Sequence, residues 1–304
     1  MRILLTGCSG QLGRHLAPRL TRLGEVVQTD RAGGGDFQCD LSDRRLLEKS
    51  LNRVRPDVVV NPAAWTAVDK AEDEPGMAER MNGEMPGWIA EWCAAHDALM
   101  LHFSTDYVFS GEPSAGDGGR AWREDDEPAP GNVYGRTKLA GERRVAESGA
   151  RAIVVRTAWL YSHLPGNFLS AILTRAAQGS ALKIVSDQAG SPTWAGHLAD
   201  ASVELLKRRD RMDERFGLFH VAGQGRMSWF EFGSLAVDKA VAAGGLDAPV
   251  PVEPIDSAKW PQKARRPVWS VLDCGRYQRF TGTSLPTVEQ GLDACLEKWK
   301  DSIC

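Results

Sequence analysis

The amino-acid sequence predicts an α/β protein with a doubly wound parallel sheet and a smaller C-terminal lobe. Short apolar runs alternate with amphipathic runs over the first half of the chain, as in repeated strand–helix units. A glycine-rich turn separates the first apolar run from the first amphipathic one. Beyond residue 156 the alternation gives way to aromatic and polar loops and longer helical runs. We therefore expect one domain at 1–156 and a lobe at 157–304.

Each expected strand is a short apolar run without strict alternation, which is typical of strands buried on both faces of a parallel sheet. These runs lie at 2–6, 25–30, near Phe37, 57–61, 98–103 and 151–156, and a further strand near 218–221 is expected to return to the sheet. Helices are expected after the glycine turn, around Trp88–Cys93, and at 167–178, 197–208, 228–243 and 287–299.

Composition narrows the class of protein. The 304 residues include 37 basic and 40 acidic ones without a long single-sign block, which argues against a nucleic-acid or membrane-surface partner. The opening apolar run is too short for a signal peptide, and no 18-residue apolar stretch follows. Six cysteines show neither a Cys-x-x-Cys pair nor zinc-site spacing. We expect reduced thiols, a cytoplasmic location and no metal site.

The glycine turn, Gly7-Cys-Ser-Gly-Gln-Leu-Gly13, stands where a dinucleotide-binding fingerprint of a Rossmann-type domain would stand. Such glycines allow a tight turn and close backbone approach, so that a pyrophosphate can lie at the helix N-terminus. The spacing is one residue wider than Gly-x-Gly-x-x-Gly, and its position directly after a strand gives it weight. The predicted cofactor-binding residues here are Gly7, Gly10, Gln11, Leu12 and Gly13.

The end of the second strand leaves the choice of cofactor open. Asp30 lies twenty residues beyond Gly10, where an acid can bind the ribose 2′-hydroxyl of NADH. Arg31 follows and can instead receive the 2′-phosphate of NADPH, and a turn acid without a ligand is a third alternative. Further candidates, beside the adenine and the nicotinamide nucleotide, are Asp40, Leu41, Ala63 and Ala64.

Tyr134 and Lys138 are the candidate catalytic pair. Four residues apart on a helix, they share one face. A nearby ammonium is expected to lower the phenol pKa from about 10 and make it a usable general acid or base. Thr105, at the end of an apolar run, can hydrogen-bond the same substrate oxygen. A Tyr-x-x-x-Lys spacing arises often by chance, so its weight comes from other motifs.

Several strings together resemble the extended short-chain dehydrogenase/reductase superfamily and, within it, the dTDP-4-dehydrorhamnose reductase family. They are Thr6-Gly-Cys-Ser-Gly-Gln-Leu-Gly13, Asn61-Pro-Ala-Ala-Trp-Thr-Ala-Val-Asp-Lys-Ala-Glu72, Ser104-Thr-Asp-Tyr-Val-Phe109, Tyr134-Gly-Arg-Thr-Lys-Leu-Ala-Gly-Glu142, Arg156-Thr-Ala-Trp-Leu-Tyr161, Asp187-Gln188 with Pro192-Thr193, and Arg266-Pro267. The resemblance therefore runs nearly from end to end, and it implies an NAD(P)-binding domain followed by a mainly substrate-binding lobe.

The resemblance also implies a reaction, the transfer of hydride from NADPH or NADH to the C4 ketone of a dTDP-4-keto-6-deoxyhexose, such as dTDP-4-dehydrorhamnose. Tyr134 then protonates the oxyanion, Lys138 holds the nicotinamide ribose, Thr105 hydrogen-bonds the carbonyl and Thr66 contacts the cofactor. The substrate contacts implied at matching positions are Val68, Thr105, Asp106, Tyr107, Trp159, Asn167 and Arg266. Core packing is the alternative for Trp159. A dTDP-sugar is the implied partner of a monomer or homodimer.

Comparison with related enzymes leaves three alternatives open. The related 4,6-dehydratases carry Thr-Asp-Glu where this chain has Thr105-Asp106-Tyr107, which disfavours elimination. Trp65, Ala189 and Trp269 depart from the usual pattern of the family, so a reductase of another dTDP-4-keto sugar, as in dTDP-dihydrostreptose synthesis, stays open. The other two alternatives are a 4-epimerase that keeps its NAD bound and a non-catalytic NAD(P)-binding regulatory subunit.

Overall fold

The computed structural model describes residues 1–112, 119–212 and 214–303, with side chains as far as residue 300. Within them, one sheet of seven parallel strands runs in the order β11-β6-β5-β4-β1-β2-β3. Its strands are β1 (Arg2–Leu5), β2 (Glu25–Asp30), β3 (Phe37–Gln38), β4 (Val58–Asn61), β5 (Leu99–Thr105), β6 (Arg151–Thr157) and β11 (Phe216–His220). The predicted α/β class with a parallel sheet is confirmed.

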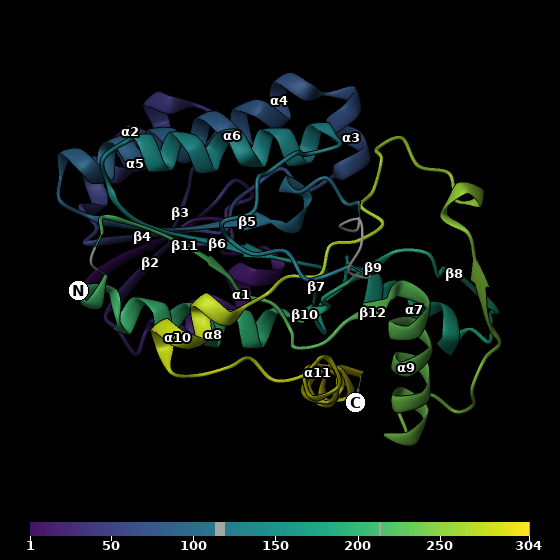
Figure 1. Cartoon of the computed structure of the whole chain (residues 1–304). Helices are drawn as coiled ribbons and strands as arrows, with labels where there is room; N and C mark the ends of the chain where they lie inside the picture. Colours follow the sequence, from purple (N-terminus) through teal and green to yellow (C-terminus); the bar gives the residue numbers. More distant parts are fainter. Residues whose placement is uncertain (113–118, 213, 304) are drawn as a thin grey trace.

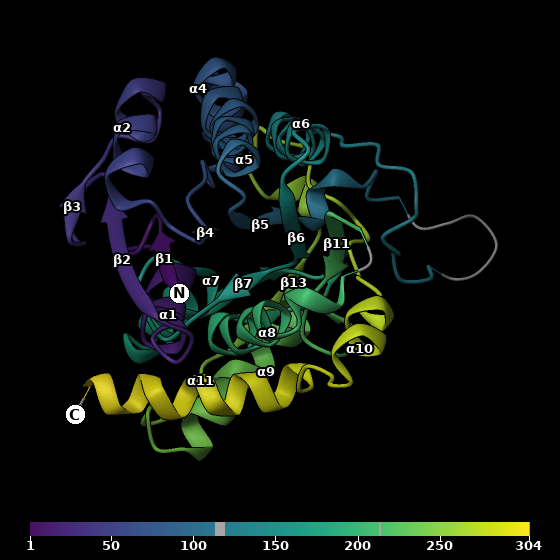
Figure 2. The ribbon, with the colours of Figure 1, turned by 90° about the vertical axis from the view of Figure 1, so that its left-hand side faces the viewer.

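Helices cover both faces of the sheet, which makes it doubly wound (Figure 1). Helices α1 (Gln11–Leu20), α8 (Ala195–Lys207) and α10 (Gly275–Thr281) pack against one face, and their apolar side chains share a core with Ile3, Leu5 and Val155. Helices α2 (Arg44–Val54), α5 (Met85–Ala95) and α6 (Val133–Glu147) cover the other face. The two helical layers are seen on either side of the sheet in Figure 2.

The chain reverses direction across the sheet between β1 and β4. The strands β1, β2 and β3 spread to one side, and β4, β5 and β6 spread to the other. In open parallel sheets, ligands bind at the carboxyl ends of the strands beside such a switch point. The glycine turn follows β1 and the Tyr134 helix follows β5, so both candidate motifs are carried to this edge.

A second core lies in the C-terminal part of the chain. Helices α7 (Phe168–Ala177), α9 (Trp229–Ala242) and α11 (Val288–Ile303) pack with the parallel pair β8 (Leu182–Val185) and β13 (Val252–Ile255). The predicted helices of this region are confirmed, with small shifts of their ends. Short strand pairs connect this core to the sheet: β7 (Leu160–Tyr161) with β10 (Thr193–Trp194), and β9 (Ala189–Gly190) with β12 (Met227–Ser228).

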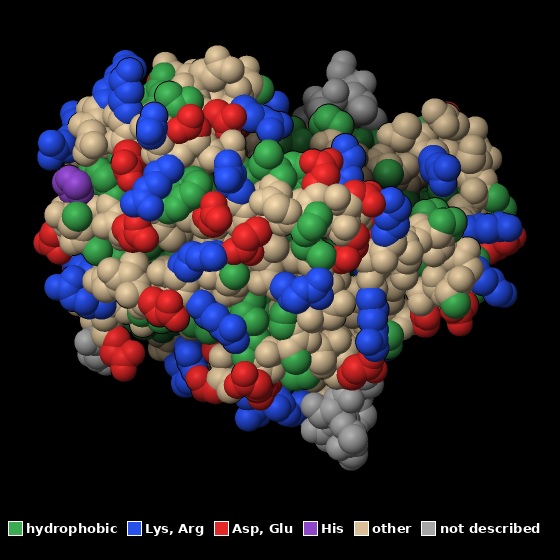
Figure 3. All heavy atoms as spheres, turned by 90° about the horizontal axis from the view of Figure 1, so that it is seen from above, with side chains coloured by type: hydrophobic (Ala, Val, Ile, Leu, Met, Phe, Trp, Pro, Cys, Tyr) green, Lys and Arg blue, Asp and Glu red, His purple; other side chains and the backbone are tan. Residues whose placement is uncertain are grey.

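The remaining elements are short. They are α3 (Val68–Asp73), α4 (Pro75–Glu79), a π-helical turn at Arg80–Glu84, and single 3₁₀ turns at Asp106–Val108, Arg209–Arg211 and Ser257–Lys259. Basic and acidic side chains are interspersed over the face that α2, α5 and α6 cover (Figure 3). In the described part of the chain, no helix is long and apolar enough to cross a membrane, and no group of three or more His, Cys, Asp or Glu side chains could hold a metal ion.

Candidate active site at the carboxyl ends of the strands

The glycine turn forms a closely packed cradle. Gly7 has a φ of 54°, a left-handed conformation that favours glycine. A Cβ atom on Gly13 would lie 2.2 Å from the carbonyl oxygen of Gly7, so α1 can pack this close only without a side chain there. The first N–H groups of α1, at Gln11, Leu12 and Gly13, have no acceptor within the helix. Since the side chain of Leu12 is buried, only its backbone faces this cradle, which fits a pyrophosphate.

Two other segments meet the turn. Ala63, after β4, lies so close that a Cβ on Gly7 would be 3.0 Å from its Cα. From the C-terminal part, Ser162 Oγ donates to Gln11 Oε1 at 3.2 Å, and Gln11 Nε2 donates to Gly166 O at 3.4 Å. The side chain of Asn167 caps α7 and donates to the carbonyl oxygens of residues 162 and 164. Its amide therefore holds the loop that lies against Gln11.

Asp30 is tied back to the glycine turn. Its Oδ2 accepts from Ser9 Oγ at 2.6 Å, and its Oδ1 accepts from Ala32 N at 2.8 Å. Burial alone would raise the pKa of Asp30, but the hydrogen bonds from Ser9 and Ala32 outweigh it and lower the pKa. The carboxylate is thus an ionised acceptor beside the turn, and Ser9 already uses one of its oxygens.

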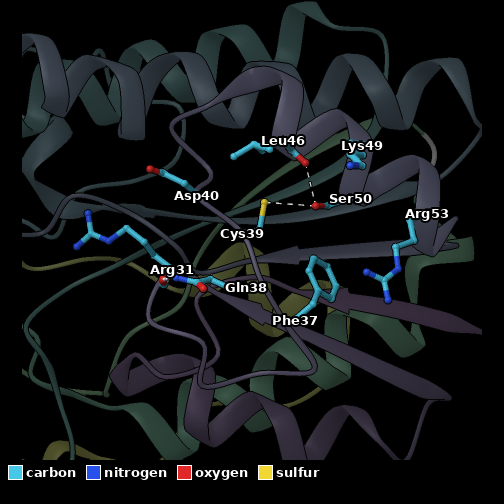
Figure 4. Close-up of a pocket in the computed structure, with 9 residues that line it drawn as sticks. All are labelled: Arg31, Phe37, Gln38, Cys39, Asp40, Leu46, Lys49, Ser50 and Arg53. Atoms are coloured by element: carbon cyan, nitrogen blue, oxygen red, sulfur yellow. Dashed lines mark hydrogen bonds between the residues drawn. The ribbon is translucent and has the colours of Figure 1, made fainter.

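Arg31 and Asp40 instead line an open pocket of about 480 Å³ between β3 and α2 at the edge of the sheet. The other lining residues are Phe37, Gln38, Cys39, Leu46, Lys49, Ser50 and Arg53. Arg31 and Arg53 lie at opposite ends of this pocket, and Lys49 projects from α2 (Figure 4). Leu41 follows Asp40 and is buried in the core. The pocket is therefore lined by three basic side chains, of Arg31, Lys49 and Arg53, and one acidic side chain, of Asp40.

Lys138 projects from α6 into the protein interior. Asn132 begins this helix, accepting from Gly135 N at 2.8 Å. The Lys138 side chain is buried, and its Nζ donates to Phe103 O at 2.6 Å and lies 3.4 Å from His102 Nε2. Burial lowers the pKa of Lys138 to about 8, and the carboxylate of Glu142 opposes that shift. The ammonium is therefore held mainly by uncharged acceptors of β5.

The prediction that Lys138 lowers the pKa of Tyr134 is wrong. Burial raises the pKa of Tyr134 to about 12, and a hydrogen bond with Thr105 only partly offsets this. The physical reason is that the Lys138 side chain bends toward β5, so helical spacing does not bring its charge to the phenol. The ring of Tyr107 packs edge-on against Tyr134, with centroids 5.6 Å apart. Tyr134 therefore keeps its proton through neutral pH.

Thr105 and Asp106 lie behind this phenol, at the end of β5. Thr105 Oγ1 accepts from Tyr107 N at 3.2 Å and donates to Asp106 Oδ1 at 3.0 Å. Burial raises the pKa of Asp106 to about 6, against hydrogen bonds from Ser270 and Thr105. Its Oδ2 is buried without a hydrogen-bond partner in the described structure. The structure thus brings Thr105 to the Tyr134 phenol, with a hardly solvated carboxyl beside them, whereas the Lys138 ammonium turns toward β5.

Arg266 reaches the same edge from the C-terminal part. Its guanidinium makes two bonds to Asp69, with Nη2–Oδ2 at 2.7 Å and Nη1–Oδ1 at 3.1 Å. These hydrogen bonds from Arg266 help to lower the pKa of Asp69 to about 2. Val68, beside Asp69, is partly buried at the start of α3, whereas Thr66 is exposed. The pair thus fastens the segment around residue 266 to the start of α3.

Trp159 is held in a strained position. It has a φ of 46°, and its ring stacks on Trp229 with centroids 3.5 Å apart and planes 3° apart. A Cβ on Gly190 would lie 2.3 Å from the ring, so the indole fills the space that a side chain there would need. The backbone of Trp269 forms an isolated parallel β-bridge with Ala189, the residue before Gly190. Trp159 is therefore a partly buried member of an aromatic wall with one face covered.

Four residues of this edge escaped the sequence-based prediction: Ser9, Asn61, Asp69 and His102. Ser9 was visible inside the glycine turn, and Asn61 and His102 were visible as polar residues in apolar strands. Asp69 lies within a string that resembles the family, but its partner is 197 residues away. No local sequence signal pairs Asp69 with Arg266.

The chain is similar to known proteins over nearly its whole length. The family model described as "RmlD substrate binding domain" matches residues 1–300. The dTDP-4-dehydrorhamnose reductase of Escherichia coli K12 is 35% identical over 98% of this chain and 98% of its own length. The enzyme of that name from Streptomyces griseus is 40% identical over 91% of this chain and 87% of its own length. The chain belongs to the dTDP-4-dehydrorhamnose reductase (RmlD) family.

Solved structures of proteins with this name have the same fold as this chain. A dTDP-4-dehydrorhamnose reductase from Clostridium acetobutylicum superposes with a TM-score of 0.86 at 32% identity, covering 98% of this chain and 99% of that one. A member of the family from Bacillus anthracis, in complex with NADP, has the same TM-score at 28% identity, with the same coverage. A Thermus thermophilus UDP-glucose 4-epimerase, at 20% identity, shares the fold. The resemblance found in the sequence motifs is confirmed.

Proposed function

We propose that this protein reduces the C4 ketone of dTDP-4-dehydrorhamnose with NADPH or NADH and forms dTDP-L-rhamnose. The observation that carries the proposal is that Tyr134, hydrogen-bonded to Thr105, and Lys138 stand on one helix at the carboxyl edge, in a chain that reductases of this name match over nearly its full length. A regulatory subunit has no need of all three groups.

The residues of the cradle fit a dinucleotide. The unpartnered N–H groups of α1, in a turn where a Cβ would clash, suit a pyrophosphate, and the residues assigned to it are Gly7, Gly10, Gln11, Leu12 and Gly13. We assign Asp30, Arg31, Asp40 and Leu41 to the adenosine end, and Ala63, Ala64, Thr66, Tyr134 and Lys138 to the nicotinamide end. Hydride for C4 is the chemistry that the bound cofactor supplies.

The proton comes from Tyr134. A phenol whose pKa is raised to about 12 is protonated at neutral pH and acts as the general acid toward the C4 oxyanion. The O–H bond of Tyr134 breaks as the new O–H bond at C4 forms. The Thr105 hydroxyl orients the carbonyl oxygen by turning its proton from Asp106 Oδ1 to that oxygen, and the Lys138 ammonium would hold the nicotinamide ribose. The site thus acts in the direction of reduction.

We assign the substrate side to residues on both parts of the chain. Val68, Thr105, Asp106 and Tyr107 would contact the substrate from the first part of the chain, and Trp159, Asn167 and Arg266 would contact it from the C-terminal part. Asn167 acts through the loop it holds, and Arg266 through its pair with Asp69. Accordingly we regard 1–156 as the NAD(P)-binding domain and 157–304 as mainly the substrate-binding lobe of a cytoplasmic monomer or homodimer.

The test follows the loss of NADPH absorbance, and separately of NADH absorbance, with dTDP-4-dehydrorhamnose, and identifies the product sugar. Tyr134→Phe should lower kcat by about 10²–10⁴-fold, the usual contribution of a general acid. Tyr161→Phe is the matched control, because the Tyr161 hydroxyl is buried in the C-terminal core without a described partner. No turnover by folded wild-type protein, or full turnover by Tyr134→Phe, would refute the proposal.

A reductase of another dTDP-4-keto sugar is the second candidate. The observation that favours it is the contact between Ala189 and Trp269, two departures from the usual family pattern that lie side by side. Turnover of a different dTDP-4-keto sugar with a kcat/KM well above that for dTDP-4-dehydrorhamnose would select this candidate. Turnover without consumption of NADPH would point to an epimerase.

A further inference from the structure

A buried polar chain crosses three strands beneath Lys138. His102 is fully buried in the middle of β5, among apolar neighbours such as Met100 and Val154. Its Nε2 lies 3.4 Å from Lys138 Nζ, and its Nδ1 lies 3.1 Å from Nδ2 of the Asn61 side chain on β4. Asn61 Oδ1 accepts from Thr6 Oγ1, just after β1, at 2.6 Å. An imidazole within the apolar part of β5 therefore connects the central strands to the candidate catalytic lysine.

The proton positions in this chain follow from Lys138. An ammonium only donates, so it pairs with an imidazole nitrogen that carries no proton. Burial and the Lys138 charge hold the pKa of His102 well below its usual value, so the ring is neutral and its proton is on Nδ1. In the structure Asn61 Nδ2 faces Nδ1 and Asn61 Oδ1 accepts from Thr6 Oγ1, so with a proton on Nδ1 the amide turns over: Oδ1 then accepts from Nδ1–H, and Nδ2 donates to Thr6 Oγ1. The Thr6 hydroxyl suits either orientation because it donates or accepts.

Lys138 has two acceptors on one strand. One proton goes to Phe103 O at 2.6 Å and another faces His102 Nε2, which leaves the third for a bound ligand. The carboxylate that supports the charge, Glu142, is itself engaged by Arg156 through bonds of 2.7 and 2.9 Å. Tyr134 is the remaining titratable group of α6 on this face. Loss of a neutral acceptor therefore acts directly on the stability of the buried ammonium.

We propose that His102 is a positioning residue for the reduction, whose neutral Nε2, fixed by Asn61 and Thr6, orients the Lys138 ammonium and keeps it charged. This inference rests on the proposed function, because it takes Lys138 to act in the site as an ammonium. A histidine that merely filled the core would affect stability and leave the charge of Lys138 unchanged. The two roles are therefore separable by experiment.

The first experiment measures kcat/KM against pH at saturating NADPH. His102→Met removes the acceptor at similar size, and His102→Gln keeps a neutral oxygen acceptor. In the His102→Met variant, the fall of kcat/KM at high pH (the basic limb) should begin about one pH unit or more lower, as expected for losing a hydrogen bond to a charged group. In the His102→Gln variant, this fall should return to its wild-type pH. The matched control is His220→Met on β11, equally buried but bonded to Trp122 O. It should lose stability without moving the limb.

A wild-type limb in His102→Met, or identical limbs in the Met and Gln variants, would overturn the inference. A second measurement needs no variant: nitrogen NMR of the wild-type imidazole should show His102 as the Nδ1–H tautomer, and a proton on Nε2 would overturn the inference as well. A third measurement, the pH dependence of the NADPH Kd in the same variants, does not require turnover of a sugar. If wild-type protein turns over no sugar but this Kd shifts with His102→Met, the proposed reaction fails and the inference about Lys138 stands.

Discussion

Removal of one partner of the buried Arg156–Glu142 pair should strongly destabilise the protein. Both side chains are nearly inaccessible, 3% and 6% exposed, and Arg156 donates to both oxygens of Glu142. The guanidinium also lies 5.0 Å from the ring centre of Phe109. Glu142→Leu would leave this charge buried without a counterion. Breaking a buried pair in this way costs about 3–5 kcal/mol, whereas an exposed pair contributes less than about 1 kcal/mol.

The assay is urea unfolding followed by tryptophan fluorescence, with the free energy of unfolding extrapolated to water. Glu142→Leu should lower that free energy by about 3–5 kcal/mol, and adding Arg156→Met should restore most of it, because the double variant no longer buries the Arg156 charge without its counterion. The control is Arg44→Ala, which removes the exposed bond to Glu48. A loss below about 1 kcal/mol in Glu142→Leu, or a double variant less stable than the single one, would refute the reasoning.

Three further outcomes are expected. Arg31→Ala should raise the KM for NADPH by about tenfold or more and leave that for NADH nearly unchanged, since a lost charge-assisted contact to a 2′-phosphate affects only one cofactor; equal changes in steady-state kinetics would contradict this. Because the ammonium of Lys138 is lost as pH rises through about 8, kcat/KM should fall above that pH, with the Tyr134 phenol not contributing; a profile flat through pH 8 and beyond would contradict the assignment. Gly13→Ala should weaken NADPH binding and destabilise the protein by about 1–3 kcal/mol, because the new Cβ would lie 2.2 Å from Gly7 O; Gly76→Ala, with nothing within 4 Å, should change neither the NADPH Kd nor the urea midpoint.

The elements of the sheet could be predicted because their signals are local. The run 57–61 lacks polar alternation and became the central strand β4, and the Gly7–Gly13 turn became the link from β1 to α1. Both features depend on residues adjacent in the sequence, so periodicity and turn chemistry suffice to find them. The strand–helix alternation then leaves few topologies, because parallel crossovers have one hand.

Contacts between distant segments could not be predicted in this way. Asp69 and Arg266 are 197 residues apart, and nothing near either residue indicates the other. The hydrogen bond from Ser9 to Asp30 is equally invisible, because it depends on how the turn after β1 meets the end of β2. These pairs arise from the order of strands in the sheet, which single residues do not encode.

The pKa values of Tyr134 and Lys138 show how such contacts change the chemistry. Spacing alone predicts a lysine that lowers the phenol pKa, which would favour a tyrosinate suited to taking a proton from an alcohol. In the folded chain, burial favours the uncharged form of each side chain. It raises the pKa of Tyr134 to about 12 and lowers the pKa of Lys138 to about 8. A phenol that retains its proton is the form that a ketone reductase needs at neutral pH. The burial that raises the pKa of Tyr134 therefore favours reduction, although it contradicts the prediction made from helical spacing alone.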